Sequence, residues 1–129
     1  MRHERTSPLR PTTVREMSRI FRTSVASVHP HYVTKVEKKS RTKAELHQVI
    51  EWLTGFDDAA LAVIWLRAPP SKDFFTAARL NLRASSITGT ICGVRIEDIN
   101  DPLMQKIRYL DKLVDELARG RSMDKILRA

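Results

Sequence analysis

The chain contains a single cysteine among its 129 residues, so a fold held by internal disulfides is excluded. A lone thiol suits a reducing compartment, and we expect the protein to be cytoplasmic. No apolar run approaches the roughly 20 residues that a membrane-spanning helix needs, so we expect no membrane partner. The N-terminal stretch is basic and lacks the apolar segment of a secretory signal peptide, so we expect no such signal.

Catalytic and metal-binding motifs are equally scarce. Cys92 could form a dyad or a metal site with a histidine, but a catalytic thiol needs a nearby base and an electropositive setting, and the sequence supplies neither. One cysteine in an apolar stretch is more often a small buried hydrophobic residue. His29 and His31 have no third or fourth ligand at metal-binding spacing nearby. We therefore expect no cofactor and no metal, and the balance favours a protein that is not an enzyme.

The overall composition is that of an ordinary globular protein, with 42% hydrophobic and 29% charged residues. The formal net charge of +8 and a pI near 10.2 favour anionic partners. Residues 1–22 hold six arginines against two glutamates, so half of that net charge lies there. We expect residues 1–17 to be a flexible basic arm, or an over-long translation start upstream of Met17, and residues 18–129 to form one helical domain.

The strongest helical pattern lies between Asp101 and Gly120. Asp101 can cap a helix N-terminus, and Pro102 fits the first helical position because its missing N–H is not needed there. Gly120 can adopt the left-handed conformation that ends a helix. We therefore predict a long helix over residues 102–119. Its apolar stripe recurs at alternating spacings of four and three residues: Leu103, Ile107, Leu110, Val114 and Leu117.

Shorter helices are predicted elsewhere. Thr42 and Glu45 form a capping box at the start of an apolar-periodic segment that Gly55 ends, and Asp57 or Asp58 can cap the next helix. The other predicted elements are a helix over 30–39 with Pro30 in its first turn, a helix over 72–80 capped by Ser71, a loop over 81–86, a short helix followed by an extended segment over 87–99, and a last helical turn capped by Ser122.

A basic run precedes the capping box and carries a net charge of +4. Such side chains can neutralise phosphates, while the helix N-terminus that follows adds N–H donors. The next two helices superficially resemble a helix-turn-helix, but Asp57 and Asp58 would repel phosphate where a recognition helix contacts DNA. The candidate nucleic-acid-binding residues are Lys35, Lys38, Lys39, Arg41 and Lys43.

An acidic cluster precedes the long helix. Glu97, Asp98 and Asp101 could supply paired carboxylates for acid–base chemistry or a divalent cation. Helix capping and complementarity to the helix dipole explain the same spacing more simply. Nearby arginines are available to pair with these acids. The candidate pocket that this region offers consists of Cys92, Arg95, Glu97 and Arg108.

Several segments together resemble a known bacterial family. They are SVASVHPHYVTKVEKKSRTKAEL, WLTGF, ITGTICGVRIEDINDPLMQKIRYLDKLVDELARG and MDKIL. In combination they are similar to the family catalogued as domain of unknown function 2200, from about Ile20 to the C-terminus. The resemblance implies a compact all-helical orthogonal bundle and implies no activity. Members of that family begin near Met17, which supports the interpretation of residues 1–16 as an extension.

These observations predict an all-α protein, a small orthogonal bundle of five to six short helices around the central helix 102–119. The function class that they favour is a non-enzymatic protein-interaction or self-associating module, whose partner is a second copy of the chain or another protein. The alternative is a nucleic-acid-associated protein that uses the basic segment 35–43.

Overall fold

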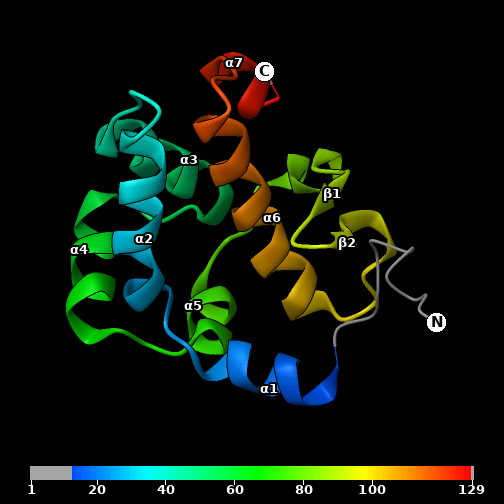
Figure 1. The fold of residues 1–129 in the computed structure, drawn as a ribbon. Coiled ribbons are helices and arrows are strands. Elements are labelled where there is room, and N and C mark those ends of the chain that lie inside the picture. Colours follow the sequence, from blue (N-terminus) through cyan, green and yellow to red (C-terminus); the bar gives the residue numbers. More distant parts are fainter. Residues whose placement is uncertain (1–12, 129) are drawn as a thin grey trace.

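The computed structural model describes residues 13–128, and its ribbon is predominantly helical (Figure 1). This confirms the predicted all-α helical bundle. Within the described residues the α-helices are α1 (Val14–Arg22), α2 (Val25–Glu37), α3 (Lys43–Thr54), α4 (Asp58–Arg67), α5 (Ser71–Ala77), α6 (Pro102–Ala118) and α7 (Met123–Ile126). The shorter elements are the 3-10 helices η2 (Leu82–Ser86) and η3 (Ile96–Asp98) and the strands β1 (Thr90–Ile91) and β2 (Val94–Arg95).

Helix α6 is the central helix, as predicted. The Asp101 carboxylate caps it by accepting a hydrogen bond from the Met104 N–H at 2.8 Å. Four residues of the predicted apolar stripe are buried in the core, namely Ile107, Leu110, Val114 and Leu117, and Leu103 is partly buried against it. Gly120, at φ +88°, follows the helix in the left-handed conformation. No helix among the described residues is long and apolar enough to cross a membrane.

The other elements pack around α6 from several sides (Figure 1). Helices α2 and α3 pack against α6 and against each other, and α4 lies outside them against α2. Helices α1 and α5 contact each other and α6, and the strand β1 and helix η3 contact α6 as well. Helix α7 also packs on α6, and Ile126 from α7 is fully buried in the core.

The predicted start of α3 is confirmed. The Glu45 N–H donates to Thr42 Oγ1 at 3.0 Å, and the Thr42 N–H donates to Glu45 Oε1 at 2.9 Å, which is a complete capping box. Gly55 ends the helix at φ +74°. Of the two aspartates that could cap α4, Asp57 does so, accepting a hydrogen bond from the Ala60 N–H at 2.8 Å.

The prediction for α2 was wrong about its start. Ser24 caps this helix, with the Ser27 N–H donating to Ser24 Oγ at 3.0 Å, so the helix begins at Val25 and not near Pro30. Pro30 lies inside the helix. Pro30 has no N–H to donate, so the helix continues through it with one backbone hydrogen bond fewer.

The chain is helical from Val14, which lies within the predicted arm 1–17. Thr13 and Glu16 form a capping box there, with hydrogen bonds of 3.1 Å and 2.9 Å. Residues 14–17 are therefore helical. Residues 1–12 lie outside the described residues, so the rest of the predicted arm stays a prediction.

Ser71 does not cap α5, contrary to the prediction. Its hydroxyl donates to the Thr23 carbonyl at 2.6 Å and its N–H donates to the same oxygen at 2.9 Å, which ties the start of α5 to the end of α1. Helix α5 ends at Ala77, earlier than predicted. The predicted loop 81–86 contains the 3-10 helix η2, which begins where Asn81 Oδ1 accepts a hydrogen bond from the Arg83 N–H.

Residues 90–95 form a small hairpin in place of the predicted short helix. Thr90 pairs with Arg95 and Ile91 with Val94 in antiparallel register. Cys92 and Gly93 turn the chain with φ +53° and +79°, the left-handed pair that tight hairpin turns require. The expectation of a buried cysteine was wrong. Cys92 is exposed because it lies at the tip of the hairpin turn.

Gly55 and Gly120 both end helices, and comparing them tests how much a nearby backbone atom adds to the cost of replacing such a glycine. A Cβ at Gly55 would lie 3.0 Å from the Arg79 carbonyl oxygen, whereas a Cβ at Gly120 would meet nothing within 4 Å. Both residues have positive φ, which costs a side chain about 1–2 kcal/mol. We expect Gly120→Ala to lower the free energy of unfolding by about 1 kcal/mol and Gly55→Ala to lower it by at least twice that amount. Urea denaturation measures both, and equal losses would show that the Arg79 contact imposes no constraint.

Candidate functional site

The net charge of the described residues belongs to two segments of the chain and one further arginine. Residues 13–128 contain 20 Lys and Arg against 14 Asp and Glu, a net charge of +6. Three parts of the chain hold most of the bases: residues 35–45, residues 112–128 and Arg83. Together they contain eleven bases and five acids, so their net charge is also +6. We call this set the basic end. The remaining described residues have nine bases and nine acids and are neutral.

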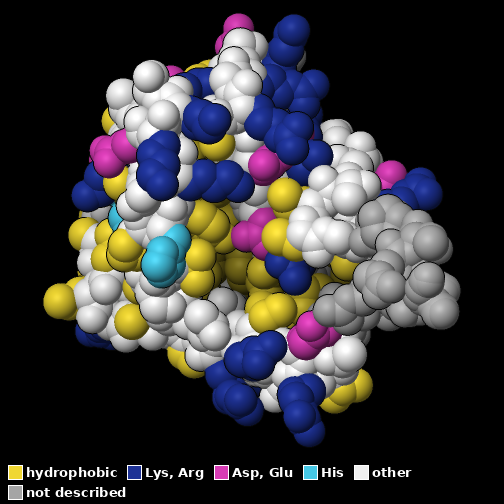
Figure 2. All heavy atoms as spheres, in the orientation of Figure 1, with side chains coloured by type: hydrophobic (Ala, Val, Ile, Leu, Met, Phe, Trp, Pro, Cys, Tyr) yellow, Lys and Arg dark blue, Asp and Glu magenta, His cyan; other side chains and the backbone are white. Residues whose placement is uncertain are grey.

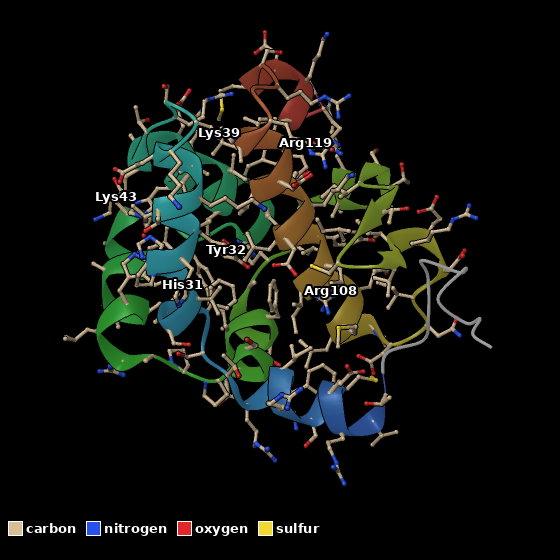
Figure 3. The ribbon with its side chains drawn as sticks, viewed as in Figure 1. His31, Tyr32, Lys39, Lys43, Arg108 and Arg119 are labelled. Atoms are coloured by element: carbon tan, nitrogen blue, oxygen red, sulfur yellow. The ribbon has the colours of Figure 1, made fainter. Side chains whose placement is uncertain are left out.

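Tertiary contacts bring the two segments of the basic end together. Lys35 Nζ lies 3.5 Å from Asp115 Oδ1, which joins α2 to α6. The Arg41 guanidinium donates to the Leu117 and Arg121 carbonyl oxygens at 3.3 Å and 2.7 Å. Figure 3 shows Lys39 and Arg119 at neighbouring ends of α2 and α6, and Figure 2 shows dark-blue side chains gathered over the end where α7 lies.

A polar cleft of about 680 Å³ opens at the basic end, between the C-terminal part of α6, η2 and the α7 segment. None of its lining residues is aromatic. Five bases and two acids line it, so the cleft has a net charge of +3. The charged lining residues are Lys112, Asp115, Glu116, Arg119, Arg121, Lys125 and Arg128.

Both acids in the cleft are already paired. Asp115 accepts from Arg119 Nε at 2.9 Å in addition to its contact with Lys35. Glu116 is buried, and its two oxygens face Arg128 at 2.7 Å and Arg121 at 3.1 Å. The Glu116–Arg128 pair also holds the C-terminal segment against α6. Because five bases line the cleft against these two acids, the field that the cleft presents to solvent is positive.

The predicted basic run divides into solvent-facing and structural residues. Lys38, Lys39 and Lys43 are exposed, and the Lys35 side chain is 48% exposed. The Arg41 side chain is only 14% exposed and pairs with Glu45 at 3.2 Å. Hydrogen bonds from Arg41 are the largest cause that lowers the pKa of Glu45. Arg41 therefore stabilises the junction between α3 and the end of α6.

The structure splits the predicted pocket residues into two pairs. Arg95 lies 3.8 Å from Glu97 and 3.7 Å from Asp98 on the exposed side of the hairpin. Glu97 Oε1 accepts from the Gly89 N–H at 2.9 Å, and backbone hydrogen bonds lower the pKa of Glu97. This pair forms a local ion-pair cluster at the surface and does not line the polar cleft at the basic end.

Cys92 and Arg108 meet at a residue that sequence reasoning missed, Asp111. Arg108 Nη1 donates to Asp111 Oδ2 at 2.8 Å, and Cys92 Sγ lies 3.9 Å from the same oxygen. Although the residue as a whole is exposed, partial burial of its sulfur and then the charge of Asp111 raise the pKa of the Cys92 thiol. The thiol is therefore held protonated, which is opposite to what a nucleophilic cysteine needs.

A second missed feature is a histidine pair between α2 and α3. His29 Nε2 and His47 Nε2 are 2.8 Å apart, and the His29 ring stacks on Trp65 of α4 with centroids 4.1 Å apart. The three residues are far apart in the sequence, so no local sequence motif predicts that they form a cluster. The part of the chain that the structure describes contains no group of three or more His, Cys, Asp or Glu that could hold a metal ion.

The fold and the basic end define a small all-α bundle with one strongly charged end. The chain belongs to the bacterial family described as "Uncharacterized protein conserved in bacteria (DUF2200)", whose model matches residues 19–128, and this confirms the resemblance seen in the sequence. It is similar to the protein of "Crystal structure of uncharacterized protein SP1917", with 41% identity over 86% of this chain and 92% of that chain and a TM-score of 0.80. No curated protein matches the chain.

The histidine pair predicts a loss of stability in acid. Burial is the largest cause that lowers the pKa of His29, to about 4, and burial also lowers the pKa of His47. The unfolded chain binds a proton on each histidine below a pH of about 6.5, whereas folded His29 does so only near 4. Stability is therefore fully present above pH 6.5 and falls as the pH drops towards 4. Thermal melting between pH 7 and pH 4 measures this loss.

The variant His29→Gln removes the titrating ring, so we expect a shallower fall of melting temperature in the same pH window. His31→Gln is the matched control, because His31 lies on the same helix and is exposed. We expect it to leave the pH profile unchanged. Parallel profiles for the native chain and the His29 variant would refute the assignment.

Proposed function

We propose that this protein binds double-stranded nucleic acid through its basic end, by contacts to the phosphate backbone. The observation that carries the proposal is the distribution of charge: within residues 13–128 the net charge of +6 belongs to the basic end, and the other described residues are neutral. A protein that merely needs solubility gains nothing from placing its charge at one end. Concentrated positive charge attracts a polyanion and releases its counterions.

The composition of the cleft favours contact with phosphates over contact with bases. Lysine and arginine bind phosphate oxygens without reading sequence. Proteins that bind single strands stack bases on aromatic side chains, and no aromatic residue lines the cleft. Asp57 caps helix α4 and Asp58 is its first residue, and these two acids disfavour insertion of α4 into a groove as a recognition helix. The expected binding is therefore independent of sequence.

The expectation of a protein-interaction or self-associating module has weaker support. Large exposed apolar side chains among the described residues are Val14, Val63, Leu66 and Leu82, which come from α1, α4 and η2. A stable interface between copies needs a contiguous apolar centre. Two basic ends would also repel each other. That expectation stays a prediction.

The proposal predicts strongly salt-dependent binding to a DNA duplex of arbitrary sequence. Fluorescence anisotropy with a labelled duplex, between low and moderate salt, gives the slope of log affinity against log salt. We expect Lys38→Glu combined with Lys39→Glu to reduce that slope by about 2, because each lysine that leaves a phosphate removes about one unit. Affinity at low salt should fall by at least about 10-fold.

The matched control is Arg67→Glu combined with Lys72→Glu. These two residues are exposed and belong to the neutral remainder, and the pair changes the net charge by the same amount. We expect the control to keep most of the affinity. Equal losses in the two double variants would show that net charge alone governs binding, and no binding at low salt would reject the proposal.

A further inference from the structure

The outward face of helix α4 is apolar. Every residue from 59 to 66 is apolar, so no polar side chain interrupts the helix between its two charged ends. Its inner side packs against the bundle through Leu61, Ile64 and Trp65. The outer side is exposed, and its residues follow the spacing of one helix face: Ala59, Ala62, Val63 and Leu66. We call these four residues the α4 stripe.

The α4 stripe lacks the cover that such a helix normally has. A helix that is apolar on all sides is typically buried on all sides. Here the Leu66 residue is 86% exposed and Val63 is 48% exposed. In Figure 1 α4 lies at the outer edge of the bundle, and Figure 2 shows apolar side chains along that edge. Within residues 13–128 no element covers the α4 stripe.

The two ends of α4 carry opposite charges. Asp57 and Asp58 stand at its N-terminal end, and Arg67 stands at its C-terminal end. Neither Asp58 nor Arg67 forms an ion pair within the described part of the chain. Asp58 instead hydrogen-bonds Glu51, another acid, and this contact raises the pKa of Glu51. Each end of α4 therefore presents a charge that a group of opposite sign on another molecule would stabilise.

We propose that the α4 stripe binds the same stripe of a second copy of this chain, with the two α4 helices antiparallel. An antiparallel pair places the N-terminal end of each helix beside the C-terminal end of the other. Asp58 of each copy then approaches Arg67 of the other copy, whereas a parallel pair would bring like charges together at both ends. The surface is thus complementary to itself, which is the property that a symmetric dimer requires.

The side chains of the α4 stripe suit a close helix crossing. Ala59 and Val63, and likewise Ala62 and Leu66, are four residues apart and form the two rows that interdigitate when helices cross at about −50°. The small side chains of the two alanines leave space into which Leu66 of the other copy fits. Asp58 and Arg67 lie on opposite sides of the stripe, and this crossing angle brings each towards its counterpart in the second copy.

The contact is small, so we expect a weak dimer. Two helices of ten residues do not bury the roughly 1,000 Å² expected of a stable interface. Interfaces below that size are transient, and the dissociation constant should be on the order of 100 µM. The α4 stripe includes no residue of the basic end. This proposal therefore does not depend on nucleic-acid binding and is tested separately from it.

Sedimentation equilibrium of the full-length chain measures the association. The protein is studied between about 10 µM and 1 mM, at moderate salt that screens the repulsion between basic ends. We expect the average mass to rise with concentration from 14.8 kDa towards twice that value. A mass of 14.8 kDa at every concentration would overturn the proposal and leave the α4 stripe to a different partner.

Two matched variants locate the contact. Leu66→Glu places a charge in the apolar contact, so we expect it to raise the dissociation constant by at least about 10-fold. Leu82→Glu is the control, because Leu82 is 97% exposed on η2 and lies outside the α4 stripe. It should keep the dissociation constant of the native chain. Equal values for the native chain and the Leu66 variant, or equal losses in the two variants, would refute the assignment.

Charge reversal tests the antiparallel arrangement. Asp58→Lys and Arg67→Glu each place like charges at the paired ends, so each variant alone should dimerise about 3- to 10-fold more weakly than the native chain. In a mixture of the two variants, one copy carries bases at both ends of α4 and the other carries acids. We expect this mixture to associate as strongly as the native chain. A mixture that associates no more strongly than the separate variants would overturn the proposed contact.

Discussion

The burial of α6 on several of its sides is the constraint on which the rest of the structure depends. Its buried residues include Met104, Leu110 and Leu113 as well as the polar Glu116. A helix that is apolar over so much of its circumference is stable only inside other structure. Helices from both halves of the chain therefore pack on it, and their relative positions follow from that packing. The ends of α2 and α6 are neighbours for this reason, and with them the two halves of the basic end.

One polar strip of α6 holds α2 in place beside it. Asp111 and Asp115 are four residues apart and so lie on the same face of the helix. Asp111 accepts a hydrogen bond from Tyr32 of α2, and Asp115 pairs with Lys35, one turn further along the same helix. These two contacts fix α2 alongside α6 in both position and register. Asp115 also lines the polar cleft, so this pairing shapes the basic end as well.

Capping residues in the sequence predicted the helix ends well where the end depends only on a short side chain or a glycine and the backbone next to it. Asp101, Thr42 and Gly55 act as their neighbours in the sequence indicate. Ser71 shows the limit of such signals, because its hydroxyl binds the Thr23 carbonyl across the fold and is lost as a cap. Cys92 shows another limit: an apolar stretch predicted burial, yet a tight turn places the residue at the surface.

The sequence by itself determined the helical class, the central helix and the basic run, because hydrophobic period, caps and charge are properties of neighbouring residues. It did not determine which charged side chains come together in the folded protein. Arg41 is held inside the fold, while Arg119 and Arg121, from a distant segment, join the lysines of α2 in the basic end. Nor could it show that one face of α4 stays exposed. Only the tertiary structure decided these points, since burial and pairing depend on which distant residues are brought within a few ångströms.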